Sequence, residues 1–138
     1  MIFFTDRDLG SLFPKILLAA GIQVETYNDH FKDNDLSDES WLSEVGRNEW
    51  CAVSKDKRIR YRPNEREAVM RAGVGLFIVI GTNATHKELA NNFVATYQKI
   101  EIFLEKHHPP FIAKVYRPSA KESQGRNKAG RVELWYSP

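Results

Sequence analysis

Residues 75–80 read Gly-Leu-Phe-Ile-Val-Ile, six consecutive positions without a polar side chain. A strand of this kind buries both of its faces, which is typical of a parallel sheet with helices on either side. Strand-like and helix-like segments alternate around it. The spacing of apolar residues predicts strands over 2–5, 22–26, 50–54, 75–80 and 111–116, a short edge strand over 132–136, and helices over 9–20, 38–45, 65–72 and 86–106. This alternation predicts an α/β domain with a mainly parallel central sheet flanked by helices.

Local signals predict where the helices begin and which segments connect them. Ser37 and Asn64 are suited to cap the second and third helices, and Thr85 or Asn83 the long fourth one. The polar stretch 27–36 is expected to form a loop, and 55–63 a basic loop.

The totals indicate one soluble globular domain. The chain has 138 residues, of which 42% are hydrophobic and 28% charged, so it can bury a core of ordinary size. Its apolar runs are too short to span a bilayer, and no basic segment precedes the first strand, so neither a membrane anchor nor a signal peptide is expected. A single cysteine, Cys51, excludes an internal disulfide and favours a cytoplasmic location, with the thiol buried and inert. We expect the domain over 1–116, with 117–138 as a basic C-terminal extension packed on it or trailing from it.

Charge is distributed unevenly along the chain. Residues 1–50 carry ten acidic and four basic residues, a balance of −6, and residues 51–138 carry sixteen basic and eight acidic ones, a balance of +8. An acidic site beside a basic surface suits an enzyme that attracts and cuts a polyanion. Two solvated faces would give the same totals, so both interpretations stay open.

Three acids occupy positions where they can meet. Asp6 ends the first strand, Asp56 follows the third, and Asp38 opens the helix that leads into the third. Ligands of parallel sheets bind at the carboxyl ends of the strands, and clustered carboxylates hold Mg²⁺ or Mn²⁺ for phosphodiester hydrolysis. The same acids can instead be helix-stabilising or turn-forming residues. Spacing alone does not choose between these roles.

Five stretches of sequence, taken in their order along the chain, resemble a known family. They are Phe-Phe-Thr-Asp-Arg-Asp-Leu-Gly at 3–10, Ala-Gly-Ile-Gln-Val at 20–24, His-Phe at 30–31, Asp-Glu-Ser-Trp-Leu at 38–42, and Val-Ser-Lys-Asp-Lys-Arg-Ile at 53–59. Together they resemble a PIN-like domain, in particular the compact group that includes VapC-type toxins. The resemblance covers about residues 2–115 and implies a PIN-like three-layer sandwich.

The resemblance also implies an activity, that of a metal-dependent endoribonuclease, and roles for single residues. Asp6, Asp38 and Asp56 match acids that would be catalytic and bind Mg²⁺ or Mn²⁺. Ser54, in Ser54-Lys55-Asp56, matches a Ser/Thr-x-Asp motif and would orient the acid or a water. A helical glutamate of the family has no clear counterpart, and the supporting candidates for its place are Asp8, Asp29 and Glu39.

Partners follow from the same resemblance. The chain is expected to be the toxin of a toxin–antitoxin pair that hydrolyses RNA, with an antitoxin protein and a second copy of the chain as further candidate partners. The alternative is a non-catalytic PIN-like module that binds RNA or a protein.

Two basic stretches are candidates for phosphate contact. The first adjoins Asp56 and comprises Lys55, Lys57, Arg58, Arg60 and Arg62, where cations would contact phosphates beside the metal site. The second stretch lies near Tyr116 and could hold RNA; it comprises Lys114, Arg117, Lys121, Arg126, Lys128 and Arg131. Either could also be a solvated surface.

Overall fold

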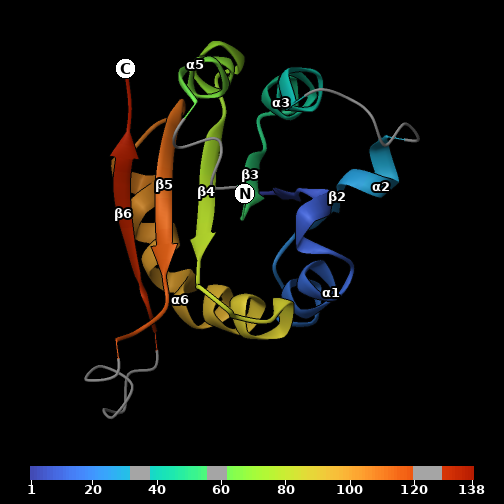
Figure 1. Cartoon of the computed structure of the whole chain (residues 1–138), viewed down its shortest axis with the longest axis vertical. Helices are drawn as coiled ribbons and strands as arrows, with labels where there is room; N and C mark the ends of the chain where they lie inside the picture. Colours follow the sequence, from blue (N-terminus) through green and yellow to red (C-terminus); the bar gives the residue numbers. More distant parts are fainter. Residues whose placement is uncertain (32–37, 56–61, 120–128) are drawn as a thin grey trace.

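The computed structural model describes residues 1–31, 38–55, 62–119 and 129–138, apart from the side chains of Asp38 and Glu39. In this part of the chain, six strands form one sheet in the order β2-β1-β3-β4-β5-β6 (Figure 1). Their bounds are β1 Phe3–Thr5, β2 Val24–Thr26, β3 Cys51–Ser54, β4 Gly75–Ile80, β5 Phe111–Tyr116 and β6 Arg131–Tyr136.

The sheet is mostly parallel, as the sequence predicts. β1 to β5 all run in one direction, and β6 pairs antiparallel with β5 as an edge strand. The carboxyl ends of β1, β3 and β4 therefore lie at one edge of the sheet, which is the edge that ligands of such sheets use.

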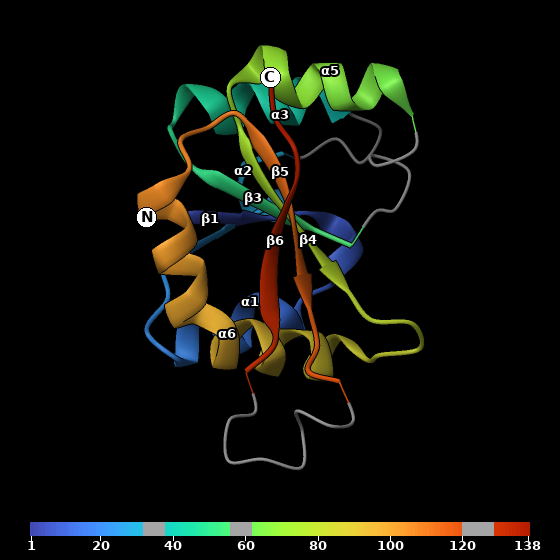
Figure 2. The same cartoon turned by 90° about the vertical axis from the view of Figure 1, so that its left-hand side faces the viewer.

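Helices pack on both faces of the sheet (Figures 1 and 2). α1 (Leu12–Ala19) and α6 (His86–Lys106) share one core with alternate side chains of the strands. α3 (Asp38–Arg47) and α5 (Pro63–Ala72) share a second core with the other side chains. In the described residues, no helix is both long enough and apolar enough to cross a bilayer.

The first strand is held by aromatic side chains on both sides. Phe3 and Phe4 are fully buried and point to opposite faces because side chains alternate along a strand. Phe3 packs edge-to-face with Phe93, with ring centroids 5.5 Å apart, and Phe4 stacks on Trp41, also at 5.5 Å. This two-sided packing fixes the position of Asp6, the residue that follows β1.

Three local predictions are wrong. The segment expected to be a loop at 27–36 contains α2 (Tyr27–His30), whose N-cap Thr26 accepts the Asp29 N–H at 3.3 Å. α5 begins at Pro63 with Arg62 as N-cap, not at Asn64, because proline is tolerated at the first helical position. The helix expected over 9–20 begins later, at Leu12, because a 3₁₀ turn, η1 (Arg7–Leu9), precedes α1. Ser37 lies outside the described residues.

The long helix is predicted correctly. α6 begins at His86 after the N-cap Thr85, which forms a capping box with Glu88. β4 and β5 also have the predicted bounds.

Candidate functional site

Asp6 lies at the carboxyl end of β1 with 7% of its surface exposed. Its N–H donates to the Val53 carbonyl at 3.0 Å, which continues the pairing of β1 with β3. Its Oδ1 accepts the Arg7 N–H at 2.7 Å and caps η1. The carboxylate is therefore fixed by the strand before it and the turn after it.

Ser54, at the carboxyl end of β3, brings two carboxylates together. Its buried Oγ lies 3.2 Å from Asp6 Oδ2 and 3.1 Å from Asp8 Oδ2. One hydroxyl has one proton to donate, so it can satisfy only one of these oxygens at a time. Two carboxylates this close repel each other unless a cation or a proton offsets the charge. Carboxylate and hydroxyl oxygens are also ligands that suit Mg²⁺ and Mn²⁺.

The structure places the other predicted acids in different ways. Asp38 opens α3, but its side chain and that of Glu39 lie outside the described residues, as does all of Asp56. Asp29 is exposed on α2 and, among the described residues, is not part of the set that Ser54 joins. The described residues contain no group of three or more His, Cys, Asp or Glu side chains placed to hold a metal ion.

The predicted phosphate-contacting residues are described only in part. Lys57, Arg58 and Arg60 lie outside the described residues. Arg62 is exposed at the start of α5, with its Nη1 4.0 Å from Glu65 Oε1. Lys55 is exposed directly after β3, beside Ser54.

His86 is a residue of this edge that sequence reasoning missed. Lys55 Nζ lies 2.9 Å from His86 Nε2. Because an ammonium group can only donate, Nε2 accepts and the proton of a neutral ring is on Nδ1. The signal for this position was the predicted N-cap Thr85, which puts His86 at the first residue of α6, shortly after β4 ends at the same edge as β3.

The start of α6 is tied to the end of β5. Arg117 Nη2 lies 3.1 Å from Glu88 Oε2. The pKa of Glu88 is lowered, first by the hydrogen bond from the Thr85 backbone, then by the Thr85 hydroxyl, and further by Arg117. An open pocket of about 300 Å³ adjoins these residues and is lined by Glu88, Asn91, Asn92, Ala95, Arg117 and Pro118.

Comparison with known proteins gives a family match. A family model described as a PIN like domain matches residues 1–81, which is more than half of the chain. The match includes β1 to β4 and therefore Asp6, Asp8 and Ser54. No curated protein and no solved structure matches the chain. Together with the mostly parallel α/β sheet, the family match shows that the chain belongs to the PIN-like domain family.

Proposed function

We propose that this protein is a Mg²⁺- or Mn²⁺-dependent endoribonuclease with the three-layer PIN-like sandwich, and that it is the cytoplasmic toxin of a toxin–antitoxin pair. One observation supports the activity most: Ser54 Oγ lies within hydrogen-bonding distance of both Asp6 and Asp8 at the carboxyl edge of β1 and β3. This edge is where parallel sheets bind their ligands.

Each residue has a role in this proposal. Asp6, Asp38 and Asp56 would hold the metal, with Asp8, Asp29 or Glu39 assisting. Ser54 would keep the carboxylates of Asp6 and Asp8 in place. When bound, the metal would activate a water and offset charge on the phosphate. Lys55, with Lys57, Arg58, Arg60 and Arg62, would contact neighbouring phosphates of the RNA.

The domain division belongs to the same proposal. Residues 1–116 would form the catalytic domain, and residues 117–138 an extension packed on it through β6. An antitoxin protein and a second copy of the chain are the proposed protein partners.

The test is RNA cleavage in the presence of Mn²⁺. Asp6→Asn and Asp56→Asn should each abolish cleavage while circular dichroism and the thermal midpoint stay near those of the wild type. Glu67→Gln is a matched control, because it removes an exposed carboxylate that pairs with Arg71 on α5. Full cleavage by both aspartate variants would refute the nuclease assignment.

A binding module without catalysis is the second candidate. It is favoured by the lack of a clear counterpart in the sequence to the helical glutamate of the family. Calorimetric titration separates the two candidates, since a nuclease should bind Mn²⁺ at millimolar concentration or below and a binding module should not. Parallel assays on DNA would identify a DNA nuclease.

A further inference from the structure

The two last strands present a polar face that the proposed mechanism does not use. Phe111, Ala113 and Val115 of β5 point into the core shared with α6, so Lys114 and Tyr116 point to the opposite face. Strand pairing places Arg131 of β6 beside Tyr116, and Glu133 beside Lys114. Cross-strand neighbours share a face of the sheet, so these four side chains lie together.

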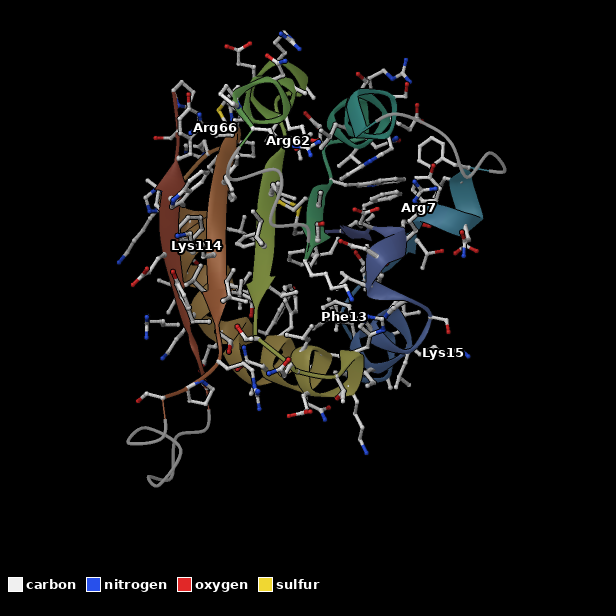
Figure 3. All side chains as sticks on the ribbon, viewed as in Figure 1. Arg7, Phe13, Lys15, Arg62, Arg66 and Lys114 are labelled. Atoms are coloured by element: carbon white, nitrogen blue, oxygen red, sulfur yellow. The ribbon has the colours of Figure 1, made fainter. Side chains whose placement is uncertain are left out.

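Rings and cations alternate along this face. The Arg131 guanidinium lies 4.3 Å from the centre of the Tyr116 ring, and Lys114 Nζ lies 5.3 Å from that of Trp135. Arg66 reaches over from α5 and lies 5.7 Å from the Trp135 ring and 5.2 Å from the Tyr136 ring. Figure 3 shows Arg66 on α5 near the start of β5 and the end of β6, with Lys114 farther along β5. We call this set the ring–cation strip: Arg66, Lys114, Tyr116, Arg131, Trp135 and Tyr136.

The strip is positively charged and partly open to solvent. It holds three cations, and the acid that β6 contributes to this face, Glu133, pairs with Arg131 at 3.2 Å. Tyr116, Trp135 and Tyr136 are each half-buried. Arg66 Nε is buried without a hydrogen-bond partner among the described residues, and the guanidinium lies over the Trp135 and Tyr136 rings.

We propose that the ring–cation strip binds single-stranded RNA. Aromatic rings and guanidinium planes stack on unpaired bases, and lysine and arginine contact phosphates. A protein partner would be expected to need an apolar centre depleted of charge, whereas here a cation lies over each ring. The positive charge and the partly exposed rings therefore favour a polyanion with flat bases.

The position of the strip connects it to the proposed catalytic edge. Tyr116 is paired with Ile80 at the carboxyl end of β4, on the same edge as Ser54. β5 is three strand spacings from β1, roughly 14 Å. An RNA strand on the ring–cation strip could therefore continue to Asp6, and this last step rests on the proposed ribonuclease function.

The test measures RNA binding without cleavage. The probe is a fluorescein-labelled 12-nucleotide oligouridylate, titrated by fluorescence anisotropy in EDTA at several salt concentrations. Lys114→Gln combined with Arg131→Gln should raise Kd about tenfold and reduce the slope of log Kd against log salt by about 1.4, since two phosphate contacts are lost. Tyr116→Leu, which keeps apolar bulk but removes the ring, should raise Kd at least fivefold with little change in the slope.

The matched control removes two cations from exposed positions of helices on the other face of the sheet. Lys15→Gln with Lys106→Gln should change Kd less than twofold. If this control and the Lys114→Gln, Arg131→Gln protein bound the oligonucleotide with equal affinity, the proposal would be wrong. A protein would then be the remaining candidate partner of the ring–cation strip.

The RNA-binding test can succeed or fail independently of the nuclease proposal. Asp6→Asn should bind the oligonucleotide in EDTA like the wild type. If Asp6→Asn and Asp56→Asn both still cleaved RNA fully while the Lys114→Gln, Arg131→Gln protein lost binding, the nuclease assignment would fail and the ring–cation strip would stand.

Discussion

The hydroxyl of Ser54, the last residue of β3, lies 3.2 Å from Oδ2 of Asp6, the residue that follows β1. The same hydroxyl lies 3.1 Å from Asp8 Oδ2. Ser54 is fully buried, so the contact is set by the pairing of two neighbouring parallel strands and not by a mobile surface side chain. This relationship gives the candidate metal site its supporting contact.

Ser54→Ala should therefore weaken Mn²⁺ binding without unfolding the protein. Loss of a residue that orients metal ligands typically costs 10- to 100-fold in affinity, and we expect an increase in the Kd for Mn²⁺ of about that size by calorimetry. Ser54→Thr keeps the hydroxyl and should stay close to the wild type. Unchanged Mn²⁺ affinity in Ser54→Ala would show that the hydroxyl does not support the site.

A second prediction concerns the contact between Gly10 and His86. Gly10 has a φ of 68°, and a Cβ added there would lie 2.9 Å from His86 Nδ1. Gly10→Ala should therefore reduce the free energy of unfolding by about 1–3 kcal/mol, because glycine alone readily adopts this backbone conformation (φ 68°, ψ −162°), with an additional loss from the clash. Urea denaturation measures the total.

Two variants separate the two contributions. Gly21→Ala introduces a side chain at a φ of 86° with nothing within 4 Å, so it should show the backbone cost alone. The double variant Gly10→Ala, His86→Ala should recover the steric part relative to His86→Ala. If Gly10→Ala and Gly21→Ala reduced the free energy of unfolding equally, the Cβ added at position 10 would not clash with His86.

The sequence predicts the sheet better than the connections. β4, β5 and α6 have the expected bounds because their signals are local: an uninterrupted apolar run, a strand after Pro109-Pro110, and a long apolar stripe beginning at Thr85. The sequence does not predict α2 because a helix of four residues, three of them exposed and polar, carries little periodicity. Its stability depends on the Thr26 cap and on Tyr27 packing against the Phe4 ring, which no local pattern shows.

The candidate site, like the fold, is predictable from the sequence only in part. The proximity of Asp6 to the end of β3 follows from alternating strands and helices. The position of Asp8 beside Ser54 depends on η1, which turns the chain back directly after β1. The pair Lys55–His86 joins residues 31 positions apart. Such a contact depends on how α6 packs against the sheet, which no local sequence pattern shows.

A third prediction uses the lowered pKa of Glu88. Its ordinary value is 4.5. Because the folded state lowers the pKa, the charged form stabilises the protein above the unfolded value, and this stabilisation is lost as the pH falls through the folded value. Glu88→Gln should thus be less stable than the wild type at pH 7, and the difference should narrow toward pH 3. Urea midpoints at several pH values measure it, and Glu105→Gln, at an exposed position near the other end of α6, is the control. A difference independent of pH would show that charge at Glu88 plays no part.

The last prediction concerns the single thiol. Cys51 is fully buried in β3, and burial raises its pKa from 9.0 to about 12. At pH 8 roughly one thiol in ten thousand is then ionised, so iodoacetamide should leave Cys51 unmodified in the folded protein and modify it in urea. Gln98→Cys provides an exposed reference thiol on α6 and should react without urea.

The raised pKa of Cys51 also predicts how the stability of the folded protein changes at high pH. The folded state favours the neutral thiol, so its contribution is complete below pH 9 and declines as the pH rises toward 12. Between pH 9 and 11 the wild type should lose stability faster than Cys51→Ala, which has no thiol to ionise. If the stability of the two proteins declined in parallel, or if native Cys51 were alkylated fast, β3 would have to open to solvent. The contact of Ser54, three residues later, would then not be held by a closed strand.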